Sequence, residues 1–201
     1  MAGIRRSQMG MLLIASLATV LNAGCGDLRP SSRGHVLDLE GRRFDPLEAT
    51  QSKATVYLFT RSDCPISNRY APEIHRLHEQ FAPKGVAFYL VYPDRNELAS
   101  TAIQHMKEYG YQCGALRDPD HVLVKMVEAE ITPEAAVFIS GASGKELVYL
   151  GRIDDRYVDF GKWRAAATKH DLQDVLEAIL DGRQVPYNRT KAVGCFIRDL
   201  R

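Results

Sequence analysis

The stretch "ATVYLFTRSDCPISNRYAPEIHRLHEQF", residues 54–81, decides how this chain folds. Its opening run, residues 54–60, is almost continuously apolar, which is typical of a strand buried on both faces of a sheet. A helix is expected to begin at Cys64 or Pro65, because proline lacks the N–H that would find no partner in a first turn. Apolar residues then recur every three or four positions and predict one buried helix face: Ile66, Tyr70, Ile74, Leu77 and Phe81. Pro72 lies inside this pattern and is expected to kink the helix.

The flanking segments extend this pattern into a parallel sheet. "GVAFYLVYP", residues 85–93, predicts a second buried strand. "NELASTAIQHMKEYG", residues 96–110, predicts a helix that ends at Gly110, and its buried face should consist of Leu98, Ala102, Met106 and Tyr109. Strand, helix, strand and helix in this order indicate a βαβ unit, while the alternation in residues 35–44 predicts a short hairpin that turns at Gly41.

The remaining segments predict an antiparallel half of the sheet and a terminal helix. Residues 117–130 predict a turn and a short helix capped by Asp118 or Asp120. Residues 131–155 predict two strands around a glycine-rich turn. Residues 168–182 predict a helix that opens with a capping-box-like pair, Thr168 and Asp171. The tail, residues 183–201, has no strong period.

The N-terminal segment has the layout of a secretory signal. Arg5 and Arg6 precede a short apolar stretch, small residues follow it, and Cys25 stands at the exit. Residues 1–24 are therefore interpreted as a signal peptide similar to that of bacterial lipoproteins, with Cys25 as the lipidated N-terminus and residues 25–33 as a tether. This places the protein on the periplasmic side of a bacterial membrane, held only by its lipid. Plain secretion into the periplasm is the alternative.

Composition excludes several classes of partner and cofactor. The 201 residues include 26 basic and 25 acidic side chains, with no basic stripe, so we expect no nucleic-acid partner. The sequence has no Walker-type or dinucleotide-binding glycine loop, and we expect no cofactor. Beyond Cys25, three cysteines remain: Cys64, Cys113 and Cys195. An odd number in a compartment where disulfides persist favours redox or nucleophilic chemistry over a purely structural framework.

The order of elements from residue 34 to 182 resembles the thioredoxin fold, an α/β three-layer α/β/α sandwich with a mixed sheet. Cys64 and Pro72 have the spacing of the first cysteine and the helix proline of thioredoxins. Thr132-Pro133 matches the cis-proline loop, which in that family lies beside the reactive sulfur and pairs with the substrate backbone. The run "CPISNRYAP" at 64–72 and "GCFI" at 194–197 resemble, more specifically, extracytoplasmic bacterial redoxins of the AhpC/TSA-like group.

Four positions depart from the family patterns. Ser67 stands where thioredoxins have their second cysteine, and Asp63 stands where tryptophan is usual. Leu58 corresponds to the buried acid of thioredoxins, and Arg61 takes the place of the threonine or serine that peroxiredoxins have. Neither the dithiol site nor the peroxiredoxin site is therefore intact.

The position of Cys64 favours a reactive thiolate. Backbone N–H groups and the dipole at a helix N-terminus stabilise negative charge, and a cysteine reacts only as its thiolate. Arg61 and Arg69 are expected to lower the pKa of Cys64 further, whereas Asp63 opposes them. Ser67 lies one turn on, close enough to hydrogen-bond the sulfur. The competing interpretation is a buried, inert cysteine.

A reactive Cys64 needs a second thiol to resolve its product. The candidates are Cys195, Cys113 and an external thiol, and the resemblance favours Cys195. We therefore predict an oxidoreductase with antioxidant character that acts on a protein thiol, a disulfide or a peroxide and is served by an external thiol reductant. Cys64 and Cys195 would react, Pro133 would contact the substrate, and Ser67, Arg61 and Asp63 would tune the thiolate.

Two alternatives remain. The fold could be a non-catalytic binding module in which Cys64–Cys195 is a structural disulfide. Copper handling is the other, but copper-delivery proteins of this fold have a Cys-x-x-x-Cys pair, and residue 68 is Asn. His75 and His78 have helical i, i+3 spacing that could hold a metal, but a solvent-facing position is the simpler interpretation, and we expect no metal site.

Overall fold

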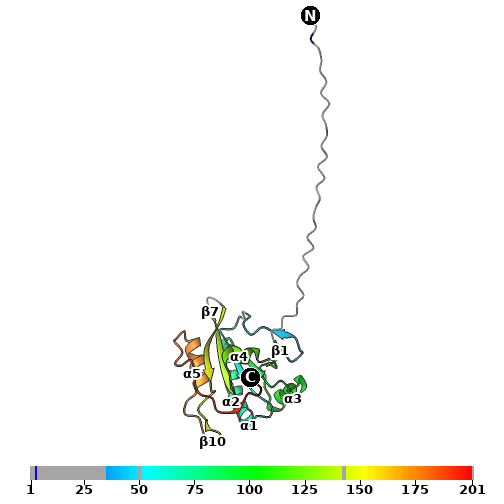
Figure 1. Ribbon diagram of the computed structural model, residues 1–201. Coiled ribbons are helices and arrows are strands. Elements are labelled where there is room, and N and C mark those ends of the chain that lie inside the picture. The colour runs from blue at the N-terminus through cyan, green and yellow to red at the C-terminus, as the bar shows by residue number, and fades with distance from the viewer. Residues whose placement is uncertain (1–2, 4–34, 49–50, 142–143, 201) are drawn as a thin grey trace. The chain divides into compact units, whose positions relative to one another are not determined.

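The two apolar runs around the Cys64 segment form the centre of a mixed sheet in the computed structural model (Figure 1). The structure describes residues 3, 35–48, 51–141 and 144–200. Strand β3 (Ala54–Phe59) is buried along its whole length and pairs in parallel with β4 (Val86–Tyr92). The central βαβ unit predicted from the sequence is confirmed.

Among the described residues, seven strands form this sheet, in the order β2-β1-β5-β4-β3-β7-β8. The outer strands are β1 (Val36–Asp38), β2 (Arg43–Phe44), β5 (Gly114–Arg117), β7 (Glu134–Gly141) and β8 (Gly144–Gly151). Strand β5 runs parallel to β4, whereas β7 is antiparallel to both β3 and β8. Both predicted hairpins, β1–β2 and β7–β8, are present.

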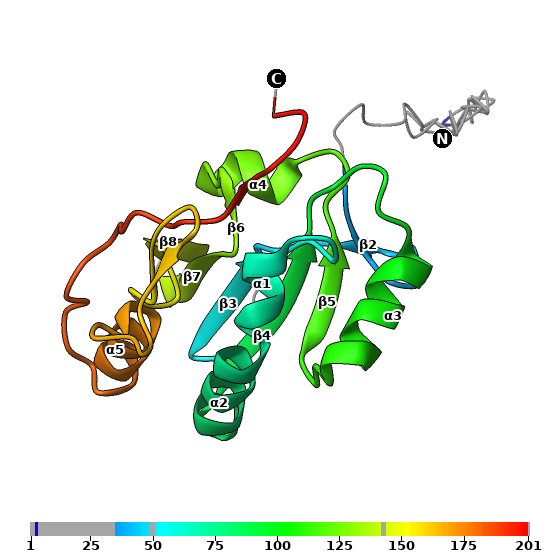
Figure 2. The ribbon, with the colours of Figure 1, turned by 90° about the horizontal axis from the view of Figure 1, so that it is seen from below.

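Helices cover both faces of the sheet. One face carries α1 (Pro65–Arg69), α2 (Ala71–Phe81), α3 (Ala99–Tyr109) and α5 (Asp171–Leu180), whose buried residues share one apolar cluster. A short 3-10 turn, η1 (Ala82–Lys84), follows α2. The other face carries α4 (Val122–Val127) and Ile197 of the C-terminal segment, which runs beside α4 in Figure 2. The chain thus has the predicted thioredoxin-like α/β/α arrangement.

The helix expected over residues 64–81 is divided into two. Helix α1 ends at Arg69 and α2 begins at Ala71, while the N–H of Tyr70 bonds the Ser67 carbonyl instead of continuing a regular helix. The cause is Pro72, which has no N–H to donate and whose ring would meet the carbonyl of Asn68. Pro72 therefore lies in the first turn of a new helix. The sequence predicted a kink at this point, and the structure has a complete break between two helices.

The buried face of α3 differs from the prediction. Leu98 precedes the helix and is 62% exposed, so its assignment to the buried face was wrong. His105 is buried beside Ala102 instead. Gly110 ends the helix in the left-handed conformation, as expected.

Only one of the two predicted caps forms. The Asp118 carboxylate accepts hydrogen bonds from the N–H groups of Val122 (2.7 Å) and Val124 (2.9 Å), and it caps α4. The capping-box-like pair before α5 does not form, because Thr168 donates its hydroxyl hydrogen to Asp155 (2.6 Å). The carboxylate of Asp171 is bound by the Arg152 guanidinium instead.

The tail contributes a strand that the sequence pattern did not predict. Strand β11 (Cys195–Phe196) pairs antiparallel with β6 (Ile131–Thr132), and the tail belongs to the same compact unit as the sheet, residues 33–201. Strands β9 (Tyr157–Asp159) and β10 (Lys162–Trp163) form a separate small hairpin.

The predicted signal peptide, residues 1–24, Cys25 and the tether to residue 33 lie outside the described residues, apart from Gly3. Across the described ranges, no helix is long and apolar enough to cross a membrane.

Candidate active site

Cys64 stands at the N-terminal cap of α1. Its side chain is only 1% exposed, and its sulfur accepts a hydrogen bond from the backbone N–H of Ser67 at 3.5 Å. Pro65 occupies the first turn, as the sequence predicted. The strand that precedes Cys64 and the helix that follows it therefore fix the sulfur beyond the C-terminal end of the central strand β3.

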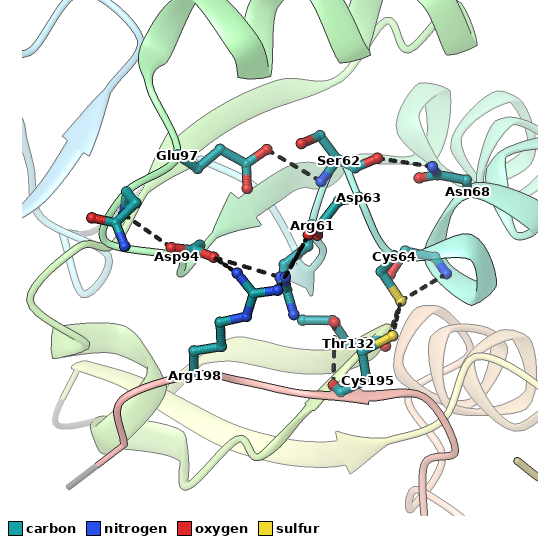
Figure 3. Close-up of polar contacts among 12 residues, drawn as sticks. Arg61, Ser62, Asp63, Cys64, Asn68, Asp94, Glu97, Thr132, Cys195 and Arg198 are labelled. Carbon is teal, nitrogen blue, oxygen red and sulfur yellow. Dashed lines mark hydrogen bonds and ion pairs between the residues drawn. The ribbon is translucent and has the colours of Figure 1, made fainter.

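The tail strand brings Cys195 onto Cys64. The two Sγ atoms lie 2.8 Å apart, and both cysteines are free thiols (Figure 3). Cys195 is paired with Thr132 in the β6–β11 ladder, and the Thr132 hydroxyl donates to the Cys195 carbonyl at 3.3 Å. Of the two partners considered from the sequence, Cys195 is the one that the structure places beside Cys64.

The cis-proline loop lies against the two cysteines and contacts the Cys64 sulfur. The Thr132-Pro133 peptide bond is cis, and Cys64 in its thiol form donates to the main-chain oxygen of Thr132 at 3.3 Å. Gly194 approaches the same oxygen so closely that a Cβ at this position would collide with it. Only glycine therefore allows the tail to lie this near to residue 132.

The two thiols have pKa values shifted in opposite directions. Burial raises the pKa of Cys64, but hydrogen bonds from Cys195 and Ser67 outweigh burial, and the pKa lies below its ordinary value. Burial also raises the pKa of Cys195, and its hydrogen bond to Cys64 and the negative charge there bring it to about 12. Cys64 is therefore the thiol of the pair that ionises first, while Cys195 keeps its proton and can donate it to the Cys64 sulfur.

The predicted tuning residues surround this pair. The Arg61 guanidinium is buried, donates to Asp63 at 2.7 Å, and lies 3.8 Å from the carboxylate of Asp94. Arg61 and Asp63 have smaller effects on the pKa of Cys195 than burial and Cys64 have: the charge of Arg61 lowers it and the charge of Asp63 raises it. The side chain and the backbone N–H of Ser67 both lower the pKa of Cys64, although only the N–H, at 3.5 Å, meets the sulfur with hydrogen-bond geometry, and the buried hydroxyl has no such partner among the described residues.

The third cysteine lies in a different pocket. Cys113 lines a cavity of about 40 Å³ together with His75, His78 and Tyr111. Burial raises the pKa of Cys113 to about 11, which disfavours its thiolate. Both histidines are half-buried on α2.

One group of three potential metal ligands occurs in the described part of the chain: Glu73, Asp154 and His170. Both carboxylate oxygens of Glu73 already accept hydrogen bonds from Arg76, at 2.9 and 2.6 Å. The group therefore gives no support to a metal site.

Sequence reasoning missed the residues that hold the Cys64 loop. The N–H of Ser62 donates to Glu97 at 3.2 Å, and the Asn68 side chain donates to the Ser62 carbonyl at 2.9 Å (Figure 3). The Asn68 oxygen is in turn bonded to His105 at 2.9 Å, and His105 to the hydroxyl of Tyr92 at 2.8 Å. Asn68 lies in the run that suggested the resemblance, but nothing in the spacing of His105 or Glu97 connects them to this loop.

A groove of about 940 Å³ borders the tail strand. Gly194 and Phe196 line it, together with Phe160 and Glu134. Because neighbouring residues of a strand face opposite sides, the groove lies on the side of β11 away from the Cys64 sulfur. Phe160 and Phe196 are 73% and 74% exposed, so the groove presents aromatic surface.

Comparison with known proteins identifies a family whose model matches the chain and solved structures that have a similar fold. The model of the AhpC/TSA family matches residues 33–145. Among solved structures, an uncharacterized conserved protein from Geobacillus kaustophilus is 24% identical, with a TM-score of 0.70 over 82% of this chain and 87% of the other. A hypothetical protein from Sinorhizobium meliloti 1021 is also 24% identical, with a TM-score of 0.68 over 82% and 89% of the two chains.

A secreted disulfide oxidoreductase from Mycobacterium tuberculosis is more distant. It is 20% identical, with a TM-score of 0.47 over 74% of this chain and 94% of that one. No curated protein matches the chain.

Proposed function

Because the chain belongs to the AhpC/TSA family, we propose that it is a thiol-dependent oxidoreductase in which Cys64 attacks and Cys195 resolves. The observation that carries the proposal is the 2.8 Å approach of the two sulfur atoms, with the lower pKa on Cys64. A thiolate beside a protonated partner thiol is the pair that two-step thiol–disulfide exchange needs.

The exchange transfers two electrons from the cysteine pair to the substrate. The Cys64 thiolate attacks one sulfur of a substrate disulfide, a mixed disulfide forms, and the other substrate sulfur leaves as a thiolate. Cys195 then loses its proton and attacks the Cys64 sulfur, which closes the Cys64–Cys195 bond and releases the second substrate thiolate. An external thiol reductant returns both cysteines to the reduced state.

The pKa of Cys195 supports this order of events. Its elevation comes from burial and from the hydrogen bond to Cys64 and the negative charge there. Once Cys64 has formed a mixed disulfide, it carries no charge, and the contribution of that charge disappears. Cys195 therefore becomes easier to deprotonate at the step in which it must attack.

We propose a protein disulfide as the substrate: the aromatic groove, on the other side of β11 from the Cys64 sulfur, would hold the polypeptide that flanks the substrate cysteine rather than the reacting disulfide itself. A hydroperoxide is the second candidate: the Cys64 thiolate would attack its terminal oxygen, the O–O bond would break to release an alcohol, or water from hydrogen peroxide, and Cys195 would then displace the sulfenic oxygen as water and close the disulfide. Replacement of Phe196 by Ala should lower the rate with a protein disulfide and leave the rate with hydrogen peroxide unchanged. Turnover of peroxide alone would assign the second substrate.

We further propose that the protein is exported, that residues 1–24 are removed, and that Cys25 carries a lipid. Mass spectrometry of the N-terminal peptide from membranes tests this directly. A Cys25→Ala variant should appear in the soluble fraction. Recovery of both forms from the membrane would contradict the lipid anchor.

The test of function is a redox titration of the purified chain with mapping of cysteine pairs at each potential. A Cys64–Cys195 disulfide that forms and breaks above about −300 mV supports an enzyme. A bond that resists reduction below that potential supports the alternative, a binding module with a structural disulfide. In a Cys195→Ser variant, the mixed disulfide between Cys64 and the substrate should accumulate. A Cys113→Ser variant is the control and should retain full activity.

A further inference from the structure

Arg198, two residues after strand β11, connects the tail to the loop that carries Cys64. The Arg198 guanidinium lies 3.5 Å from the carboxylate of Asp63 and 3.4 Å from that of Asp94 (Figure 3). Asp63 directly precedes Cys64 in the chain, and Asp94 follows β4. Arg198 thus links the tail to the residue that precedes Cys64 and to the segment that follows β4.

The two aspartates that receive Arg198 are already fixed in place. The buried Arg61 lies 2.7 Å from Asp63 and 3.8 Å from Asp94. The Asp94 side chain also accepts a hydrogen bond from the backbone of Asn96 at 2.9 Å, and it is only 10% exposed. Two guanidinium groups and two carboxylates therefore form one cluster of alternating charge. Arg198 is the member of this cluster that the tail contributes.

Upstream of Cys195 the tail is bonded to β8, where Asn188 and Thr190 make backbone hydrogen bonds with Leu150, but around Cys195 itself the backbone contacts are few. The tail's ladder with β6 comprises two residue pairs, and one further backbone bond joins the N–H of Ile197 to the Glu130 carbonyl at 2.9 Å. Ile197 is buried against the apolar face shared with α4. So short a ladder leaves the position of Cys195 dependent on the side chains that follow it.

We propose that Arg198 is a positioning residue, which holds Cys195 at bonding distance from Cys64 through its ion pairs with Asp63 and Asp94. Its effect is on the effective concentration of the Cys195 thiol at the Cys64 sulfur, and through it on the rate and equilibrium of disulfide closure. The proposal rests on the proposed exchange between these two cysteines, but its measurement needs no knowledge of the substrate.

The chain offers a matched control on the same tail. Arg189 is 57% exposed at its side chain against 59% for Arg198, and it too makes an ion pair at 3.4 Å, but with Glu128. Arg189→Gln therefore removes a tail cation of similar exposure without touching the Cys64 loop. Arg198→Lys keeps the charge at the position that Arg198→Gln neutralises.

The experiment is the equilibrium of the Cys64–Cys195 disulfide with glutathione, measured on the full chain. We expect Arg198→Gln to lower the effective concentration roughly three- to tenfold, as two partly exposed ion pairs allow, and Arg198→Lys to restore part of it. Arg189→Gln should change it less than about twofold. The pKa of Cys64, measured in a Cys195→Ala background, should be unaffected by Arg198→Gln, because the residue acts on position.

A second measurement needs no variant at position 198. About 1 M NaCl shortens the screening length to roughly 3 Å and should bring the wild-type equilibrium close to that of Arg198→Gln. Equal effects of the two glutamine variants, no dependence on salt, or a shifted Cys64 pKa would each overturn the proposal and leave the proposed function standing. Failure of the wild type to form a reversible Cys64–Cys195 disulfide would remove both.

Discussion

Cys64 and Cys195 approach within 2.8 Å at their sulfur atoms, although they are 131 positions apart in the chain. The contact exists because the last residues of the chain return to the cis-proline loop and pair with it as a strand. Burial contributes a pKa increase to both thiols, but hydrogen bonds reverse its effect at Cys64 alone. The two thiols therefore differ in acidity although they lie in contact.

The pH dependence of alkylation should distinguish the two thiols. Below the pKa of Cys64 both are protonated; above it, and below about 12, only Cys64 is a thiolate. With iodoacetamide, Cys64 labelling should rise at a pH below that of an ordinary cysteine, while Cys195 should remain unlabelled up to strongly alkaline pH in those molecules whose Cys64 is still unmodified. Peptide mapping after timed labelling provides the measurement.

Replacement of Cys195 by Ala should raise the pKa of Cys64. The substitution removes the hydrogen bond that the Cys195 thiol donates, and burial of Cys64 then has less to oppose it. The ultraviolet absorbance of the Cys64 thiolate, followed against pH in a Cys113→Ser background, reports the change. An unchanged or lower pKa would show that Cys195 does not stabilise the thiolate.

Gly194→Ala should separate the two sulfurs. A Cβ at position 194 would collide with the carbonyl oxygen of Thr132, which is backbone and cannot rotate away. We expect the tail to lose roughly 1–3 kcal/mol of docking free energy, seen as a lower effective concentration of Cys195 in the glutathione equilibrium. Phe196→Ala, at a side chain 74% exposed, is the control and should leave the equilibrium within about twofold.

Ile197 should matter far more for the site than its neighbour Phe196. Ile197 is 4% exposed and packs in the apolar cluster beneath α4, whereas Phe196 points into the groove. Ile197→Ala is expected to cost about 2 kcal/mol or more and to release the tail. Hydrogen exchange of the Ile197 amide, which bonds the Glu130 carbonyl, measures this opening. Equal protection in the two alanine variants would show that the tail is held elsewhere.

The sequence predicted those parts of the fold that depend on local pattern. The continuous apolar runs at β3 and β4 could only be buried strands, and Cys64 before Pro65 marked a helix start. The break at Tyr70 and the exposure of Leu98 were not predicted, because both depend on where a helix ends rather than on its period. Thr168 and Asp171 have capping-box spacing, but Thr168 bonds to Asp155 and Asp171 pairs with Arg152 instead.

The candidate site was predicted only as far as resemblance extends. Cys195 could be suggested from "GCFI", but a two-residue strand has no period, and pairing with Thr132 has no local signature. The contacts of Arg61, Asp94 and Arg198 join three segments distant in sequence. Ion pairs of this kind arise from the tertiary fold, and no spacing in the chain specifies them.

A chain of buried hydrogen bonds behind the Cys64 loop leads to the last prediction. His105 lies between Tyr92 and Asn68, and Asn68 donates to the Ser62 carbonyl. Since the Asn68 oxygen can only accept, the His105 Nε2 must carry the hydrogen, and Nδ1 then accepts from the Tyr92 hydroxyl. In this arrangement the ring is neutral, which is the form that burial favours.

Protonation of His105 should destabilise the fold. Burial lowers the pKa of His105 below its ordinary value of 6.5, so the unfolded chain takes up a proton at a higher pH than the folded protein. The stability that the neutral ring contributes is complete above the unfolded pKa, and it is lost as the pH falls through the folded pKa. Urea unfolding between about pH 7.5 and 4.5 should show this decline, and His105→Gln should reduce the slope. His170→Gln, at an exposed histidine, should keep the wild-type slope, and equal slopes in all three proteins would show that another group titrates.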